Sequence, residues 1–316
     1  MSDKKKLLIL SAAAVMLIAA FMFIGLGNNW GYALPKRAMK IFAIVLTGAA
    51  IAFSTLIFQT ITNNRILTPS ILGLDSLYML IQTILIFVFG STNLTWMNKQ
   101  VNFVLSVVLM ILFAGILYKI LFKREGENIY FLLLVGLIFG TFFQSFTSFM
   151  QVLIDPNEFQ IIQDRMFASF NNVQTDVLIL ALIILVLVSL YFIRFMKYLD
   201  VLSLGKEHAV NLGVDYDYTV KRLLIVVAIL ISVATALVGP ITFLGLLVVN
   251  VTYEMFRTFR HSYLLAGSIL VSIIALIGGQ LIVERVFTFS TTLSVIINFV
   301  GGVYFIYLLL KENKKW

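Results

Sequence analysis

Apolar runs recur along the whole chain and are separated by short polar segments. Most of these runs are long enough for a helix to cross the hydrocarbon core of a bilayer, which takes about 18 or more residues. The first run follows a short basic lead, and no small-residue cleavage site precedes Asn28, so we expect a span there and not a signal peptide. The pattern predicts ten membrane spans, of which the eighth is short. The expected ranges are residues 7–26, 41–61, 70–89, 101–122, 129–153, 177–194, 223–238, 243–255, 263–283 and 293–310.

The composition supports a membrane protein and excludes a soluble globule. Apolar residues make up 61% of the chain, the mean hydropathy is +1.02, and only 12% of the residues are charged. Soluble domains are closer to half apolar. We therefore expect an all-α polytopic membrane protein in which residues 1–316 form a single transmembrane domain. The chain has no cysteine, which excludes disulfides, thiol chemistry and cysteine-bound metals.

Lysine and arginine are divided unevenly between the two sides that ten spans create. Ten spans place both chain ends on one side, and Lys and Arg accumulate on the cytoplasmic side of membrane proteins. Topology therefore explains the net charge of +8 better than nucleic-acid binding does, and the side with the chain ends is expected to be the cytoplasm. Six basic residues fall on the other side: Lys36, Arg37, Lys40, Lys99, Arg165 and Arg285. The remaining seventeen share the side of the chain ends, at positions 4, 5, 6, 65, 119, 123, 124, 194, 197, 206, 221, 222, 257, 260, 311, 314 and 315.

The most polar stretch of the chain, residues 197–222, lies between the sixth and seventh spans. Within it, Gly205 and Gly213 bracket a segment of mixed polar and apolar residues, which is typical of a short helix with two faces. Lipid would reject so many charges, so the stretch must lie in water or against another protein. We interpret it as a docking element that inserts into a groove of a partner. The alternative is a solvated loop that only joins two spans.

Two places carry glycine and proline where a continuous helix would be interrupted. Pro69 and Gly73 lie at the start of the third span, and Pro240 and Gly245 precede or begin the eighth at a similar spacing. Corresponding Gly/Pro-broken segments in two halves of a membrane protein indicate a transporter built from repeats. The alternative is that Pro and Gly are simply common in membrane helices.

The chain lacks the residue patterns of common enzymes and of ion-coupled carriers. It has no phosphate-binding loop of the GxxxxGK[ST] kind, no HExxH and no GxSxG, so we expect neither catalysis nor a bound cofactor. His208 and His261 fall in polar connections, where we expect them to be solvated. Asp75 and Glu254 fall near the expected cytoplasmic ends of spans, which leaves no internal charge to couple an ion gradient. We infer a passive channel or a translocator driven by a partner.

Several segments together resemble one family of transport proteins. They are TGAAIAFSTLIFQ (47–59), NRILTPSILGL (64–74), SLGKEHAVNLGV (203–214), LVGPITFLGLLVV (237–249) and NFVGGVYFIYLLL (298–310). These segments are similar to the FecCD/BtuC-type permease subunits of ATP-binding-cassette (ABC) importers for iron–siderophore, haem and vitamin B12. The resemblance covers residues 34–311, which is nearly the whole chain.

The resemblance implies a type II ABC importer permease fold with ten spans. It also implies two permease subunits side by side, two cytoplasmic ATPases that hold ATP and Mg²⁺, an external substrate-binding protein, and a bacterial cytoplasmic membrane. The segment matching residues 205–213 resembles the helix that couples a permease to its ATPase, which agrees with the docking element inferred from polarity. The matching coupling residues are Gly205, Lys206, Glu207, His208, Ala209, Leu212 and Gly213.

Three basic residues on the expected external side also match the family. Arg37 and Lys40 correspond to a pair of basic residues, usually both Arg, and Arg285 looks like a third at the outer end of the ninth span. The resemblance implies that these cations meet carboxylates of the binding protein. Exposed ion pairs contribute only about 0–1 kcal/mol each, so several would be needed to set the register. The alternative is that they are ordinary interfacial anchors of the spans.

The segment NNRILTPSILGLDSLY (63–78) is similar to the catecholate-siderophore branch of the family, whose members tend to work as two non-identical permeases. We therefore expect a ferric siderophore importer built on a heterodimer with a paralogue. Val249 and Asn250 stand where the family usually has Pro-His, a change that affects the helix-break geometry. The alternatives are a haem or vitamin B12 importer of the same architecture, an ion-coupled secondary carrier, and a structural membrane scaffold.

The docking element generates a direct prediction. Charge reversal at Lys206 together with Glu207, or a bulky residue at Gly213, should uncouple ATP hydrolysis from transport, because each change alters the surface expected to fit the ATPase. Membrane insertion should be unaffected. Both rates would be measured in vesicles, and normal transport by these variants would contradict the docking role.

Overall fold

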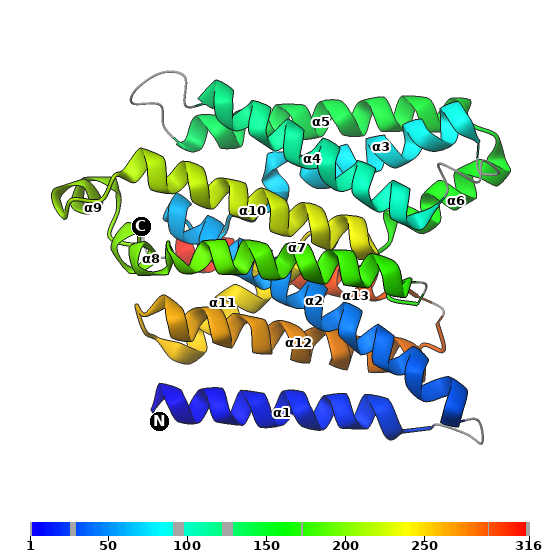
Figure 1. Cartoon of the computed structure of the whole chain (residues 1–316), viewed down its shortest axis with the longest axis horizontal. Coiled ribbons are helices and arrows are strands. Elements are labelled where there is room, and N and C mark those ends of the chain that lie inside the picture. Colours follow the sequence, from blue (N-terminus) through cyan, green and yellow to red (C-terminus); the bar gives the residue numbers. More distant parts are fainter. Residues whose placement is uncertain are drawn as a thin grey trace.

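The computed structural model describes residues 2–25, 30–90, 98–121, 129–171, 173–289 and 291–313. These residues form helices joined by short connections, and no strand occurs among them, which confirms the all-α prediction. The long helices lie side by side along a common direction (Figure 1). The elements are α1 (Asp3–Phe23), α2 (Trp30–Thr62), η1 (Pro69–Leu72), α3 (Leu74–Phe89), α4 (Lys99–Leu121), α5 (Ile129–Leu153), α6 (Pro156–Met166), α7 (Thr175–Ile193), α8 (Met196–Leu202), α9 (Lys206–Asn211), α10 (Tyr216–Val238), α11 (Leu244–Phe256), α12 (His261–Arg285) and α13 (Leu293–Asn313).

Ten of the described helices correspond to the ten expected spans. Eight of them, α1, α2, α4, α5, α7, α10, α12 and α13, have the length and apolar composition needed to cross a membrane. The other two, α3 and α11, are apolar but shorter. At about 1.5 Å per residue they cover only part of a hydrocarbon core about 30 Å thick. Both follow the Gly/Pro segments singled out in the sequence, so the short spans are the interrupted ones.

The second span begins earlier than the apolar pattern indicated. Helix α2 starts at Trp30 and not at Ile41, so the basic segment that was expected to precede the span is itself helical. Pro35 lies inside the helix but close to its start, where its missing N–H removes a single hydrogen bond. The helix therefore carries its basic residues on a rigid extension.

Helix α6 lies between the fifth and sixth expected spans, in a polar stretch (residues 155–176) where the apolar pattern predicts no span. Asp155 caps the helix: its side chain accepts a hydrogen bond from the backbone N–H of Asn157 (2.9 Å). Pro156 occupies the first helical position, where proline is favoured. This start signal was present in the sequence, but the segment is too polar to be found as a span.

The two ends of the bundle carry different short elements. Helices α8 and α9 and the start of α1 lie at one end, which we call the α9 end, and α6 lies at the opposite, α6 end (Figure 1). Helix α13 finishes at the α9 end. The first and last helices therefore begin and end on the same side, as an even number of spans requires.

Helix α2 forms the centre of the bundle. It packs against α7, α10, α11 and α12, and every residue from Ala50 to Thr62 is buried. A helix enclosed on all faces is expected to be apolar or small all round. At Gly48 a Cβ atom would lie only 2.8 Å from Ser272 Oγ of α12, so glycine permits a close helix contact there.

The first interruption follows α2. The chain turns at the α9 end and re-enters the bundle, and buried Pro69 begins the short helix η1. Gly73 then adopts a left-handed conformation (φ +79°), which glycine accommodates without strain, and α3 starts from it. A Cβ atom on Gly136 of α5 would lie 2.9 Å from both Ile71 O and Leu72 Cα. The interruption is therefore held against the backbone of α5.

The second interruption follows α10. Gly239 has φ +100°, and a Cβ atom there would lie 3.2 Å from Ala168 Cα. Pro240 lies in the non-helical connection that follows. Gly245, by contrast, lies within α11, where a Cβ atom would come within 2.0 Å of Thr55 Oγ1. The sequence therefore placed the interruption correctly, but Gly245 serves close packing against α2 instead of breaking the helix.

The two interruptions meet on α2. A small polar cavity between them is lined by Thr55, Thr68, Ser70, Asp75, Thr235 and Thr242, among others. Within it, Thr235 Oγ1 of α10 donates a hydrogen bond to Asp75 Oδ1 of α3 (3.0 Å). Asp75 lies in the first turn of α3, at a helix end as expected, but it is enclosed by the bundle. Because the chain re-enters the bundle before α3 begins, the first turn of α3 lies in the interior.

The contact between η1 and α5 predicts different outcomes for two helix-interior glycines. Gly136→Ala should destabilise the protein by about 1–3 kcal/mol, because its Cβ atom would press on backbone that cannot move aside. Gly115→Ala, in α4, meets nothing within 4 Å and should be neutral or stabilising by up to about 1 kcal/mol. Thermal unfolding in detergent compares the two, and equal effects would contradict the close contact.

Candidate coupling segment and transport groove

Helix α9 projects from the bundle at the α9 end (Figure 1). The short helix expected between Gly205 and Gly213 is present there. Both glycines have positive φ, +96° and +82°, and nothing lies within 4 Å of either Cβ position, so only the backbone conformation calls for glycine. Backbone hydrogen bonds from Gly213 N to Val210 O (2.9 Å) and from Val214 N to Ala209 O (3.0 Å) close the helix.

The coupling segment, residues 205–213, has one face turned to the protein and one turned outward. Ala209 is fully buried. Lys206, Glu207 and His208 are exposed, and Lys206 forms a long ion pair with Asp217 (3.5 Å). Three apolar side chains beside them are also exposed: Leu204, Val210 and Leu212. Apolar side chains ringed by charges suit a surface that a partner covers.

A buried histidine connects the segment before α9 to the bundle. His261, at the start of α12, is only 3% exposed. Asp200 Oδ1 of α8 accepts from its backbone N–H (2.8 Å) and lies 2.6 Å from its ring Nδ1. The ring Nε2 lies 3.0 Å from Thr60 Oγ1 of α2. The expectation of a solvated histidine was therefore wrong for His261, because residues 200 and 60 approach it only in the fold; His208 is exposed as expected.

The same region is connected to the first interruption. Asn63 Nδ2 donates to the backbone O of Leu202 in α8 (3.4 Å). The backbone O of Arg65 accepts from Gln59 Nε2 and from Asn250 Nδ2, both at 2.8 Å. Asn250 is one of the two residues that stand in place of the family's Pro-His pair, and here its amide satisfies a carbonyl of the broken segment. Helix α8 is therefore hydrogen-bonded to the chain that leads into η1.

A polar groove of about 660 Å³ lies on the surface of the bundle, between η1, the start of α3 and α5. On α5, its polar residues recur at positions 141, 144, 145 and 148, a spacing that places them on one helix face. Phenylalanines flank them and are also exposed. The sequence carried this pattern, but the apolar run containing it was interpreted only as a span. The polar lining residues are Ser70, Ser76, Thr141, Gln144, Ser145 and Ser148.

The three basic residues expected to contact a binding protein make bonds within the chain. Arg37 donates to the backbone O atoms of Phe21, Met22, Ile24 and Gly25, at 2.9–3.0 Å. Lys40 pairs with Glu284 (2.6 Å). Arg285 donates to the O of Ile24 (2.5 Å) and Gly25 (3.5 Å). Arg37 and Arg285 therefore satisfy free carbonyls at the end of α1.

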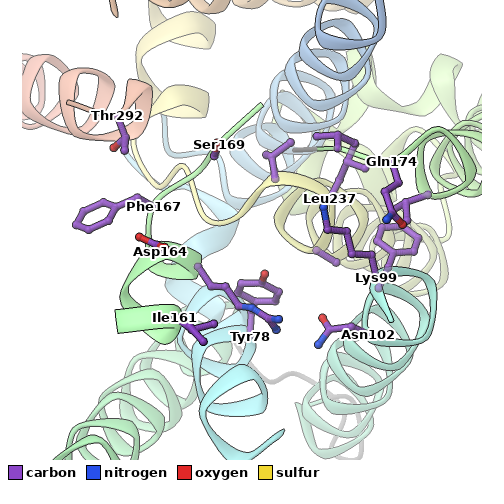
Figure 2. A pocket seen from close by; sticks show the side chains of 16 residues that line it. Tyr78, Lys99, Asn102, Ile161, Asp164, Phe167, Ser169, Gln174, Leu237 and Thr292 are labelled. Carbon is purple, nitrogen blue, oxygen red and sulfur yellow. The ribbon is translucent and has the colours of Figure 1, made fainter. Parts of the chain in front are cut away.

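A cavity of about 420 Å³ lies at the α6 end, with Tyr78, Lys99, Asn102 and Gln174 among the side chains around it (Figure 2). Helix α6 contributes Arg165, whose guanidinium donates to Gln82 Oε1 of α3. Gln82 and Asn102 of α4 exchange two amide hydrogen bonds, at 2.9 and 3.1 Å. Burial lowers the pKa of Arg165, and nearby Tyr78 opposes that shift. This network fixes α6 to α3 and α4.

One protein family matches the sequence along almost its full length. The model of the FecCD transport family matches residues 7–311. The chain belongs to this family. It is 68% identical over 316 residues to the petrobactin import system permease protein YclO of Bacillus subtilis (strain 168), and the match covers all of both chains. It is 36% identical over 278 residues to the petrobactin import system permease protein FatC of Bacillus anthracis, covering 88% of this chain and 78% of FatC.

The fold is similar to that of a solved metal-chelate type ABC transporter in an inward-facing conformation. The TM-score is 0.85 at 21% identity, and the match covers 98% of this chain and 100% of the other. Together with family membership, this identifies the chain as an integral membrane permease, a transport component and not an enzyme. Permeases of this family work with an ABC ATPase and a second permease.

The bonds of Arg37 predict a local loss of stability. Arg37→Gln should loosen the end of α1, because the guanidinium that bonds four backbone carbonyls is removed, and a hydrogen bond of a charged group contributes about 1.5–3 kcal/mol. Backbone amides near residues 20–25 should exchange with deuterium at least about tenfold faster. Lys36→Gln, which removes a neighbouring exposed cation, is the control. Unchanged exchange together with weaker binding-protein affinity would show that Arg37 acts only in docking.

Proposed function

We propose that this chain is a permease subunit of an ATP-driven importer of ferric siderophores of the catecholate type. The observation that carries the proposal is the full-length match at 68% identity to a petrobactin import permease. The positive-inside distribution supports a bacterial cytoplasmic membrane with the α9 end, and both chain ends, in the cytoplasm.

The groove along α5 supports a path at the contact of two permeases. Hydroxyl and amide groups facing hydrocarbon would be costly, because lipid offers them no hydrogen-bond partners. Gln144, Ser145 and Ser148 face outward from the protein, so something other than lipid covers them. A second permease would enclose the groove as half of a water-filled path, and the exposed phenylalanines beside it would pack against that subunit. A paralogue is our proposed second subunit, in keeping with the pair FatC and FatD of Bacillus anthracis, each a petrobactin import system permease protein.

The exposed coupling segment is an argument that a partner ATPase supplies the energy for transport. ATP and Mg²⁺ would be held by two ATPase subunits, and this chain would bind no cofactor. Closure of the ATPases would displace residues 205–213 and, with them, α8. Through Asp200 and His261 the displacement would reach α2 and α12, and through Asn63 it would reach the chain before η1. The ends of the groove could then open in turn.

The external partner is a substrate-binding protein. Arg285 is the most exposed of the three predicted docking cations, whereas Arg37 and Lys40 are partly buried. All three lie in the rigid region where α1, α2 and α12 are joined. Carboxylates of the binding protein would add to the bonds that these residues already make, and would mainly set the register and the association rate.

Transport by the reconstituted complex tests the proposal. Proteoliposomes containing this permease, its second permease and the ATPase should take up a ferric catecholate siderophore when ATP and binding protein are supplied. Uptake should persist when ion gradients are dissipated. Uptake driven by an ion gradient without the ATPase would contradict the proposal, and uptake of haem or vitamin B12 in place of the siderophore would overturn the substrate.

A paired variant tests the groove in the same assay. Ser145→Trp should abolish most uptake while the complex still assembles, because a bulky side chain would narrow the path. Leu187→Trp, at an exposed apolar position of α7 that would face lipid, should transport normally. Equal transport by both variants would show that the groove is not part of the transport path.

A further inference from the structure

Two segments far apart in the sequence bring exposed cations together at the α9 end. Lys4 and Lys5 lie in the first turn of α1, and Arg257 and Arg260 lie in the connection from α11 to α12. Lys6 joins the segments: its Nζ donates to the backbone O of Phe256 (3.4 Å) and lies 5.7 Å from the centre of that ring. We call Lys4, Lys5, Arg257, Phe259 and Arg260 the basic patch.

The charge of the basic patch is not neutralised by neighbouring carboxylates in the described part of the chain. All four cations are exposed, and among the described residues none of them forms an ion pair. Asp3 is engaged with Lys6 (3.2 Å). Glu254, exposed in the last turn of α11, carries a single negative charge against the four positive charges of the patch. The patch therefore presents a net positive surface made by two elements.

The basic patch lies at the depth of lipid headgroups. Lys4 and Leu8 share one face of α1, as do Lys5 and Ile9, because residues four apart stack along a helix. Leu8 is 71% exposed and Ile9 53%, so in a membrane both would contact acyl chains. The lysines lie one turn, about 5 Å, beyond them. Phe259, 72% exposed between the two arginines, suits the membrane–water interface, where aromatic side chains concentrate.

Helix α1 packs on α12 through apolar side chains, and its two ends differ in their polar contacts. At the α6 end its carbonyls are fixed by Arg37 and Arg285. At the α9 end, among the described residues, its polar contacts with the bundle are those of Lys6 with the backbone O and the ring of Phe256, and the fully buried residues of α1 are Leu10, Ala14 and Phe21. An anion bound between Lys4 and Lys5 on one side and Arg257 and Arg260 on the other would link α1 to the segment between α11 and α12.

We propose that the basic patch binds the phosphate headgroup of an anionic phospholipid, which bridges α1 to the α11–α12 connection. Clusters of Lys and Arg beside a membrane span attract anionic lipid in this way. The lipid is favoured over the ATPase because α9, the proposed ATPase contact, lies at the same end but well apart from the start of α1 (Figure 1). The proposal does not depend on the transported substrate.

Lipid retention by the full-length protein tests the proposal. The protein is purified from vesicles of phosphatidylcholine and phosphatidylglycerol, and the lipid that stays bound is measured by native mass spectrometry. The wild type should retain phosphatidylglycerol preferentially. The variant K4Q/K5Q/R257Q/R260Q should retain about tenfold less, and raised salt should have a similar effect.

Two controls separate the proposal from general charge effects and from misfolding. The variant R194Q/K197Q/K221Q/R222Q removes four cations from the α7–α10 side of the same end and should retain lipid like the wild type. The variant K4R/K5R/R257K/R260K keeps the charge and should recover most of the binding, which shows that the patch folds. Retention of phosphatidylcholine equal to that of phosphatidylglycerol, or equal losses in both neutral variants, would overturn the proposal. So would a patch variant that retains lipid normally but, when purified from its native membrane, loses the copurifying ATPase.

Discussion

The fold depends on finding hydrogen-bond partners for backbone N–H and C=O groups at two helix interruptions within the bundle. A helix in lipid bonds its own N–H and C=O groups, whereas an interruption exposes them where no water is present. Here side chains of neighbouring helices supply partners for such groups. Gln59 of α2 and Asn250 of α11 both donate to the carbonyl of Arg65. At the second interruption, the backbone N–H of Phe243 donates to Asn298 Oδ1 of α13 (3.4 Å).

This constraint also explains how the two functional regions are connected. The residues that satisfy the first interruption belong to α2 and α11, and the chain before η1 is bonded to α8 through Asn63. Helix α8 leads directly into the coupling segment, and η1 and α3 line the groove. The two short helices α3 and α11 begin close to each other on α2, where Asp75 and Thr235 join the halves. In the proposed mechanism, movement at the α9 end would change the groove through these contacts while the long spans stay intact.

The sequence predicted what depends on local pattern and could not predict what depends on distant partners. Apolar runs located all ten spans, and glycine spacing located α9, because both follow from periodicity and backbone preference. The pairing of His261 with Asp200 and the bonds of Arg37 to the end of α1 join residues that meet only in the fold. The polar face of α5 was readable at positions 141, 144, 145 and 148, but its meaning required the open groove. Family resemblance identified the protein class that polarity alone left open.

The central claim is that this chain is driven by a separate ATPase through residues 205–213. The most direct test is purification of the tagged protein from its native membrane in mild detergent, with mass spectrometry of the copurifying proteins. The account predicts an ATPase with a phosphate-binding loop and a second, related permease. If the folded protein copurifies with neither in several detergents, the account is contradicted, and an ion-coupled carrier becomes the better description.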